Sequence, residues 1–355
     1  MRELAFIVGL VLVAASSAGC ASTQPQRGFQ PAVPAGTTVL SMAHPVQMPV
    51  HADRRASSMA GGASKRSGLL YASDWATNGV DVFDYPSGKQ VGVLTGLDGP
   101  YGMCVDAQGD IYIGNYYGAT LVEFAHGGYM PLKTYSVVGD PIGCSVDAKG
   151  DVSVTSFNPG GVIVFAGGDP SKGTTYAGPC EFQWTMGYDD KGNLVGIGEE
   201  STGAIAACAL LAGSKSIIVL SGCCTGPMQI DFAGGTMWDG KYLAVGNQEF
   251  GGSFESGVYQ AKLSGTTLKV YGQTELTDTC FSNYTDVVNP FVVGKKNTPV
   301  NRRQGKVILG ANLWCGDGGS GGGINLWHYP AGGPVFRQIG ASLGEPYGAA
   351  VSFAK

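Results

Sequence analysis

Short runs of apolar residues alternate with polar and glycine residues along most of the chain. From residue 69 onward, runs of about four residues rich in Val, Ile, Leu, Tyr and Phe are separated by Gly, Asp, Asn and Pro. Short alternating runs bounded by turn residues are typical of β-strands. The stretch from Ala204 to Ala212 has a helical composition, but its place in the pattern predicts a strand. The pattern therefore predicts an all-β protein.

These runs recur with a period of about forty residues. The segment from Pro100 to Asp106 is copied from Pro141 to Asp147 and again from Pro346 to Ser352. An Asp followed closely by Gly comes after each clear copy, and this pair is typical of a tight turn between hairpin strands, so a structural role is predicted for these aspartates. A second strand then follows in six places: 70–73, 111–114, 152–155, 194–197, 243–246 and 307–310.

Six repeats of four short strands predict a six-bladed β-propeller. The repeat is also offset, because the first unit begins at its second strand and the chain ends on a first strand, from Pro346 to Phe353. Pairing between the N- and C-terminal strands would complete one blade, close the ring and cover two sheet edges. A solenoid is the alternative for this period, but it gives no reason for the offset.

The N-terminus predicts an export signal. The apolar run from Leu4 to Ala15 spans about 18 Å as a helix, too short to cross a bilayer core of about 30 Å. Residues 17–20 resemble the lipobox of bacterial lipoproteins, in which the cysteine carries the lipid, although Ser17 stands where that family usually has Leu. We therefore predict a signal peptide at 1–20 with lipidation at Cys20; ordinary cleavage, with Cys20 left as a thiol, is the alternative.

The segment 21–67 is rich in Pro, Gln, Ser, Ala and Gly, and it predicts a flexible linker before a propeller at 68–355. The formal net charge is −5 and charged residues make up 14% of the chain, which argues against a nucleic-acid partner. We expect a monomer that binds a small molecule or a protein and touches a membrane only through its lipid anchor.

The strand motifs resemble those of the NHL-repeat propellers. They read Pro-Tyr-Gly-x-x-Val-Asp at 100–106, Ile-Tyr-Ile at 111–113 and Val-Glu-Phe at 122–124. The chain is also similar to the wider senescence-marker-protein and gluconolactonase superfamily over about residues 69–355. This resemblance implies the fold and leaves the activity open, because one scaffold serves lactonases, lyases and binding proteins.

One face of such a propeller carries the loops that follow each second strand and precede each first strand. Nearly every unit places a polar or acidic residue there, often followed by an aromatic residue, and the pattern adds no histidine or lysine. Carboxylates and amides suit a hydroxylated ligand or Ca²⁺, and aromatic rings suit stacking. The predicted ligand-binding residues are Asp74, Trp75, Tyr101, Asn115, Tyr116, Glu181, Glu200, Asn247, Asn312 and Tyr347. The alternative is that the Asp and Asn side chains only bond loop backbones.

The sequence thus favours an exported, lipid-anchored binding module with no catalytic residue assigned. The second hypothesis is a metal-dependent, lactonase-like hydrolase on the same acidic face. The resemblance implies that Glu181, Glu200, Asn247 and Asn312 could stand in for the Glu and Asn or Asp ligands of the lactonases. The usual acidic ligand near the first innermost strand has no clear equivalent here. A divalent cation such as calcium is the cofactor that this face could hold.

Eight cysteines remain besides Cys20, and none has the Cys-x-x-Cys spacing of a zinc site. An even number in an exported protein favours disulfides. Cys280 with Cys315 is the preferred pair, because both lie in segments that depart from the repeat. Cys104 and Cys144, on predicted innermost strands, are expected to be buried thiols.

Overall fold

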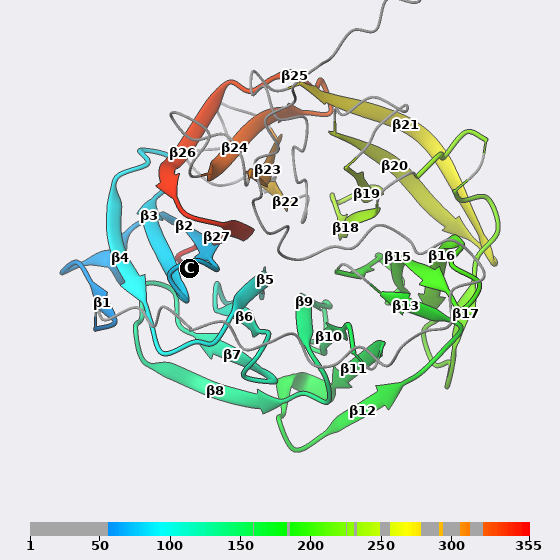
Figure 1. Ribbon diagram of the computed structural model, residues 1–355, viewed down its shortest axis with the longest axis horizontal. Coiled ribbons are helices and arrows are strands. Elements are labelled where there is room, and N and C mark those ends of the chain that lie inside the picture. Colours follow the sequence, from blue (N-terminus) through cyan, green and yellow to red (C-terminus); the bar gives the residue numbers. More distant parts are fainter. Residues whose placement is uncertain are drawn as a thin grey trace, which may run out of the picture. The chain divides into compact units, whose positions relative to one another are not determined.

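The structure is a computed structural model that describes residues 56–158, 160–182, 185–224, 226–230, 233–248, 256–277, 291–293, 306–312 and 322–355. These residues form six antiparallel sheets arranged around a centre, which is a six-bladed β-propeller (Figure 1). In this part of the chain the helical elements are two short 3-10 turns, Ala63–Lys65 and Ala166–Gly168. No helix among these residues is long and apolar enough to span a membrane. The predicted fold class is confirmed.

The first three blades each contain four strands in hairpin order, counted from the centre outward, and blade one has an added edge strand. Their bounds are: blade one, β27 (Pro346–Phe353), β2 (Gly68–Asp74), β3 (Gly79–Asp84), β4 (Gln90–Leu94) and the edge strand β1 (Ser58–Met59); blade two, β5 (Pro100–Val105), β6 (Ile111–Asn115), β7 (Thr120–Phe124) and β8 (Pro131–Ser136); blade three, β9 (Pro141–Val146), β10 (Val152–Ser156), β11 (Gly161–Phe165) and β12 (Gly173–Tyr176).

The other three blades follow the same order. Their bounds are: blade four, β13 (Cys180–Phe182) with β14 (Gly187–Tyr188), β15 (Leu194–Glu200), β16 (Ile205–Leu210) and β17 (Ile217–Val219); blade five, β18 (Ala233–Trp238), β19 (Leu243–Asn247), β20 (Ser256–Ser264) and β21 (Thr267–Thr277), with β25 (Gly333–Pro334) parallel to β21; blade six, β22 (Phe291–Val293), β23 (Lys306–Asn312), β24 (Gly322–Tyr329) and β26 (Arg337–Leu343). The ambiguous stretch at 204–212 is strand β16, as predicted.

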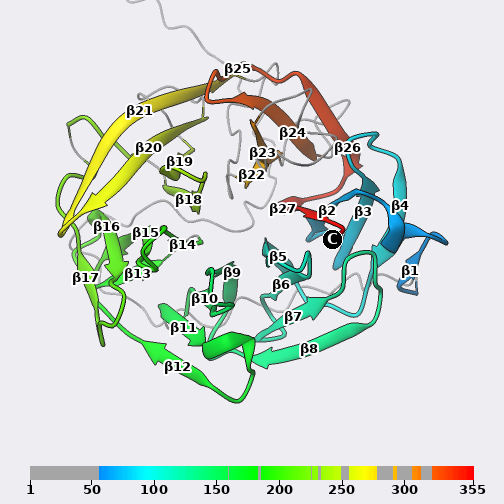
Figure 2. The same ribbon diagram turned by 180° about the vertical axis from the view of Figure 1, so that it is seen from behind.

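The ring closes through its two chain ends, as the offset repeat predicts. β27 pairs with β2 in antiparallel register, with Leu69 opposite Ser352 and Asp74 opposite Pro346 (Figure 2). His126 of blade two also contacts this closing strand, because its Nδ1 lies 2.6 Å from Ser352 Oγ and its Nε2 lies 2.9 Å from the Arg66 carbonyl oxygen. Burial lowers the pKa of His126.

The core consists of six hydrophobic clusters, each formed mainly by one pair of neighbouring blades. Strand side chains alternate between the two faces of a sheet, so a blade packed on both sides buries both sets. All seven residues of β2 are buried for this reason. Trp327, fully buried in the cluster between blades five and six, donates a hydrogen bond from Nε1 to the Thr277 carbonyl oxygen at 3.1 Å.

The predicted structural role of the turn aspartates is confirmed. Asp106 Oδ1 accepts hydrogen bonds from the backbone N–H groups of Gln108 and Asp110, at 2.8 and 2.9 Å. Gly109 completes this turn at φ +90°, a conformation that favours glycine. Asp147 makes the same two bonds one blade further on. These carboxylates therefore shape hairpins.

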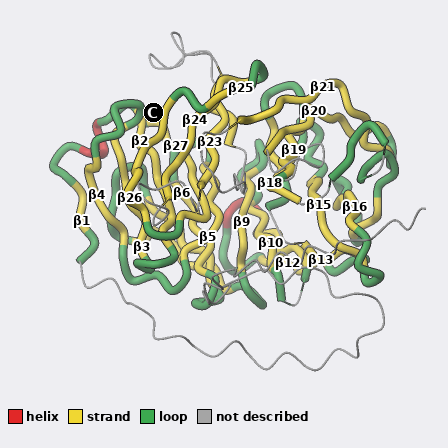
Figure 3. The backbone as a smooth tube through the Cα atoms, turned by 45° about the horizontal axis from the view of Figure 1, so that its top comes forward, coloured by secondary structure: helices red, strands yellow, loops and turns green. Residues whose placement is uncertain are grey.

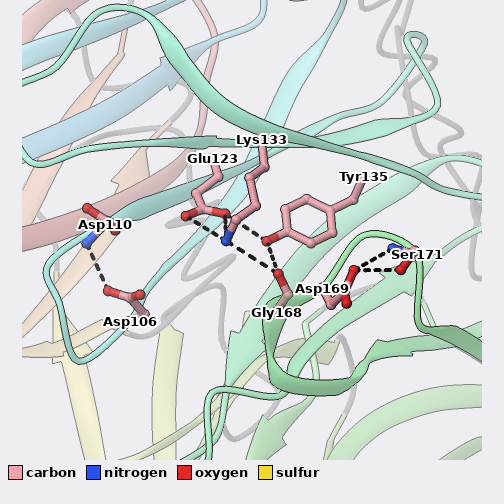
Figure 4. Close-up of polar contacts among 8 residues, drawn as sticks. All are labelled: Asp106, Asp110, Glu123, Lys133, Tyr135, Gly168, Asp169 and Ser171. Atoms are coloured by element: carbon pink, nitrogen blue, oxygen red, sulfur yellow. Dashed lines mark hydrogen bonds and ion pairs between the residues drawn. The ribbon is translucent and has the colours of Figure 1, made fainter.

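A polar network around a buried carboxylate of blade two reaches blade three near their outer strands (Figure 4). Glu123 Oε2 accepts a hydrogen bond from the Tyr135 hydroxyl at 2.7 Å and an ion pair from Lys133 Nζ at 3.1 Å. The Gly168 carbonyl oxygen of blade three lies 3.0 Å from the same hydroxyl and 3.4 Å from Lys133 Nζ. Burial, followed by the bond to Glu123, raises the pKa of Tyr135.

Disulfides link Cys104 to Cys144, Cys180 to Cys208 and Cys223 to Cys224. The expectation that Cys104 and Cys144 are thiols is wrong. They differ by one position in the repeat, so their side chains leave opposite faces of neighbouring blades and meet between β5 and β9, with their Cα atoms 5.4 Å apart. Cys280 and Cys315 lie outside the described residues. Disulfides indicate an oxidising compartment.

The end of the predicted linker packs on blade one. β1 pairs with the outer strand β4, with Ser58 opposite Val93 and Met59 opposite Gly92. Ala63 is buried as well. Residues 21–55 and the predicted lipidation site Cys20 lie outside the described residues.

Candidate functional site

The strands end at two opposite sides of the propeller (Figure 3). We call one side the channel face: it carries the loops that follow each second strand and precede each first strand. We call the other side the turn end: it carries the turns that join the first to the second strand and the third to the fourth strand. Every predicted ligand-binding residue lies in or beside the channel face.

Four of those residues form one aromatic cluster together with Tyr117. Trp75 follows β2, Tyr116 and Tyr117 follow β6, and Tyr101 and Tyr347 lie on the innermost strands β5 and β27. The Trp75 ring centroid lies 5.1 to 5.8 Å from the centroids of the four tyrosine rings. Tyr101 stacks on Tyr347 at 4.8 Å and 22°. Blades one and two therefore meet in a five-ring aromatic surface.

This aromatic cluster is graded from buried to exposed. Tyr101 is 4% exposed and forms its base, whereas Tyr117 is 52% exposed and forms its rim. Trp75, Tyr116 and Tyr347 are half-buried. The backbone at Gly99 lies against the rings, since a Cβ there would be 3.0 Å from Tyr117 Cδ2 and 3.2 Å from Trp75 Cζ3.

Tyr117 was not named from the sequence. The pattern of one polar and one aromatic residue per unit pointed to Asn115 and Tyr116, and the second aromatic ring lies one residue beyond it. The signal that could have found it is the Tyr-Tyr pair itself. Two further apolar side chains are exposed on channel-face loops beside blade three: Val138 at 63% and Phe157 at 38%.

The short polar residues at the strand ends bond the backbone of the adjoining loops. Asp74 accepts hydrogen bonds from the N–H groups of Ala76, Gly344 and Glu345 at 2.9 to 3.1 Å. Asn115 accepts one from the N–H of Asp98, and Asn247 Nδ2 donates to the Gln229 carbonyl oxygen at 3.1 Å. These contacts join the loops of the channel face, as the structural alternative expects. A ligand role for these side chains stays a prediction.

The remaining predicted residues lie away from the aromatic cluster. Glu181 is exposed on β13, and Glu200 is half-buried at the end of β15, both in blade four. Asn312 is fully buried at the end of β23 in blade six. Among the residues that the structure describes, no three His, Cys, Asp or Glu side chains lie close enough together to hold a metal ion. A divalent cation at this face remains a prediction.

Charge divides the two ends of the propeller. The channel face carries carboxylates from several blades: Asp74, Asp98, Asp140, Glu181, Glu199, Glu200 and Glu345. Every Lys and Arg within the described ranges belongs to the turn end instead, in or beside its turns or the chain ends of blade one: Lys65, Arg66, Lys89, Lys133, Lys149, Lys172, Lys191, Lys215, Lys241, Lys262, Lys269, Lys306, Arg337 and Lys355. The channel face of this part of the chain is thus anionic.

Two of these acidic residues lie next to residues of the aromatic cluster. Burial, followed by the charge of the nearby Asp140, raises the pKa of Tyr116. Asp98 lies on the loop under Tyr117, whose N–H donates to the Asp98 carbonyl oxygen at 3.0 Å. Asp98 Oδ1 is buried and has no hydrogen-bond partner among the described residues.

Solved structures share the fold at low sequence identity. A structure of a nidogen–laminin complex superposes with a TM-score of 0.57 at 12% identity, covering 81% of this chain and 99% of that one. Virginiamycin B lyase from Staphylococcus aureus gives a TM-score of 0.50 at 11% identity, with coverages of 85% and 94%. A functionally unknown protein from Desulfotomaculum acetoxidans gives 0.50 at 7%, with coverages of 81% and 99%.

No family model matches the chain, and no curated protein matches its sequence. The structural matches include a protein in a binding complex and a lyase, so they support the fold and leave the activity open. The chain is a six-bladed β-propeller, and the resemblance to the NHL and senescence-marker-protein propellers is consistent with these matches.

Proposed function

We propose that this protein is a binding module that recognises its ligand through the aromatic cluster on the channel face. The observation that carries this proposal is the five-ring surface shared by two blades, with Tyr117 on its exposed rim. Tyrosine and tryptophan dominate binding hot spots, because their rigid rings bury a large area at little entropic cost. Tyr101 and Tyr347 lie on strands and the other three rings directly follow strands, so the propeller scaffold positions the cluster.

The test compares two tyrosines of similar exposure at opposite ends of the propeller. Tyr117 is 52% exposed at the channel face, and Tyr271 is 59% exposed near the turn end. A thermal-shift screen of a defined library of small molecules, oligosaccharides and peptides would identify ligands of the wild-type protein. We expect Tyr117→Ala to lower the affinity for the ligands found by about tenfold or more. Tyr271→Ala should leave that affinity unchanged. Ligands that bind all three proteins equally would contradict the proposal.

Export with a lipid anchor at Cys20 completes the proposed function. Its support is the lipobox-like segment, together with disulfides that indicate an oxidising compartment. Stable anchoring needs more than one acyl chain, which lipidation at an N-terminal cysteine supplies. We expect the wild-type protein to fractionate with membranes and Cys20→Ala to be released. Recovery of the wild-type protein in the soluble fraction would refute the anchor and leave the binding proposal intact.

A further inference from the structure

We propose that the aromatic cluster takes an organic cation, namely an alkylammonium or quaternary ammonium group. This inference rests on the proposed function and names the ligand class of the same site. Three observations carry it: the rings themselves, the acidic residue Asp98 on the loop that bonds the Tyr117 backbone, and the absence of any cationic side chain from the channel face within the described ranges.

The rings supply attraction for a cation. The face of an aromatic ring carries negative electrostatic potential, and Trp and Tyr attract ammonium groups placed within about 6 Å of the ring centroid. Trp75, Tyr116 and Tyr117 lie 5.1 to 5.4 Å from one another. The Tyr116 and Tyr117 rings are nearly perpendicular, at 89°, so they present surfaces in different directions around a ligand. At this spacing the three rings contact one another edge to face, so an ammonium group would lie against their outward faces, where Tyr117, 52% exposed, is the most accessible of the three.

Asp98 supplies the negative charge. Its backbone is fixed on both sides, since its N–H donates to Asn115 Oδ1 and its carbonyl oxygen accepts from the Tyr117 N–H. The next residue, Gly99, lies against the rings, since a Cβ there would be 3.0 Å from Tyr117 Cδ2 and 3.2 Å from Trp75 Cζ3. The Asp98 Oδ1 atom is buried and has no hydrogen-bond partner within the described ranges, and a buried charged oxygen without a partner is costly. A ligand cation beside this loop would compensate that charge.

Within the described ranges, no lysine or arginine pairs with this carboxylate. Each described lysine and arginine belongs to the turn end, where Asp84, Asp169 and Asp239 form ion pairs with them. On the channel face, Glu181 stands directly opposite Glu199 in the pairing of β13 with β15. Like charges placed opposite each other repel. A positive charge bound near them would relieve this repulsion, so the face attracts cations. A neutral sugar could stack on the rings but would gain no electrostatic attraction from these carboxylates.

The experiment compares choline with its neutral isostere 3,3-dimethylbutan-1-ol by isothermal titration of the folded propeller. We expect choline to bind about twofold to thirtyfold more tightly, which is the range that cation–π contacts supply. Asp98→Asn should lower the affinity for choline about fivefold and leave the affinity for the alcohol unchanged. Asp190→Asn, at the turn end, is the matched control and should change neither. Raising the salt concentration should weaken choline alone.

A second arm distinguishes a free small cation from a lysine side chain of a protein. A trilysine peptide and its fully Nε-acetylated form would be titrated in the same way. Preference for trilysine over both the acetylated peptide and choline would assign the site to a basic protein segment. Preference for choline would assign it to a small quaternary amine.

The outcomes separate this inference from the proposed function. Equal binding of choline and the alcohol, or no binding of any cation, would overturn the cation assignment. If the screen still finds ligands of another class whose binding depends on Tyr117, the proposed function holds although the cation assignment is wrong. If no ligand depends on Tyr117, the proposed function fails as well.

Discussion

Removal of residues 346–355 should cost the propeller most of its stability. The deletion takes away β27, the innermost strand of blade one and the partner of β2. Ala350 is fully buried between blades one and two, and Val351, 2% exposed, packs against blade six. At ~25 cal/mol per Å² of apolar surface, loss of an entire innermost strand amounts to several kcal/mol. The net stability of a domain is only about 5–15 kcal/mol.

Deletion of Ala354 and Lys355 alone is the matched control, because both residues follow the end of β27. We expect the short deletion to melt like the full chain. The long deletion should melt well below it or aggregate through the exposed edge of β2. Calorimetry and size-exclusion chromatography measure both outcomes. Equal melting temperatures for the long deletion and the full chain would mean that the closing strand contributes no stability.

The ring closure could be predicted because it depends only on the order of strands in the repeat. An array of repeats that begins at a second strand and ends on a first strand has one way to complete its blades. The placement of the loops on one face follows from the same order. Trp75 and Tyr347, far apart in the sequence, could therefore be assigned to one face in advance.

The contacts within that face could not be predicted. Asp74 and Asn115 fitted both a ligand role and a structural role, because a short polar side chain at a strand end can reach either a ligand or the next loop. The structure shows backbone bonds at both positions. The five-ring packing depends on loop conformations, such as Gly99 at φ +69°, which no repeat pattern encodes.

The sequence also left the cysteine pairs open, since eight thiols permit many connectivities. The pairing of Cys104 with Cys144 depends on which face of its strand each side chain leaves. A shift of one position in the repeat reverses that face. The shift was visible in the aligned copies Pro100–Asp106 and Pro141–Asp147, but its consequence required neighbouring blades to be in contact.

Replacing Cys104 and Cys144 with serine together should destabilise the propeller by about 2–4 kcal/mol. The two cysteines are 40 residues apart, so their bond closes a long loop and restricts the unfolded chain. It also joins the innermost strands of blades two and three, where both side chains are buried, so that buried serine hydroxyls would add to the cost. Denaturant titration measures the change as a lower midpoint with little change in slope.

The pair Cys223 and Cys224 is the natural control. These residues are adjacent in the sequence, so their bond closes almost no loop and should restrict the unfolded chain very little. Double replacement there should therefore cost much less than replacement of Cys104 and Cys144. Equal losses from the two double variants would show that chain restriction is not the source of the stabilisation. No loss from replacing Cys104 and Cys144 would show that the contact between β5 and β9 holds these blades together without the covalent bond.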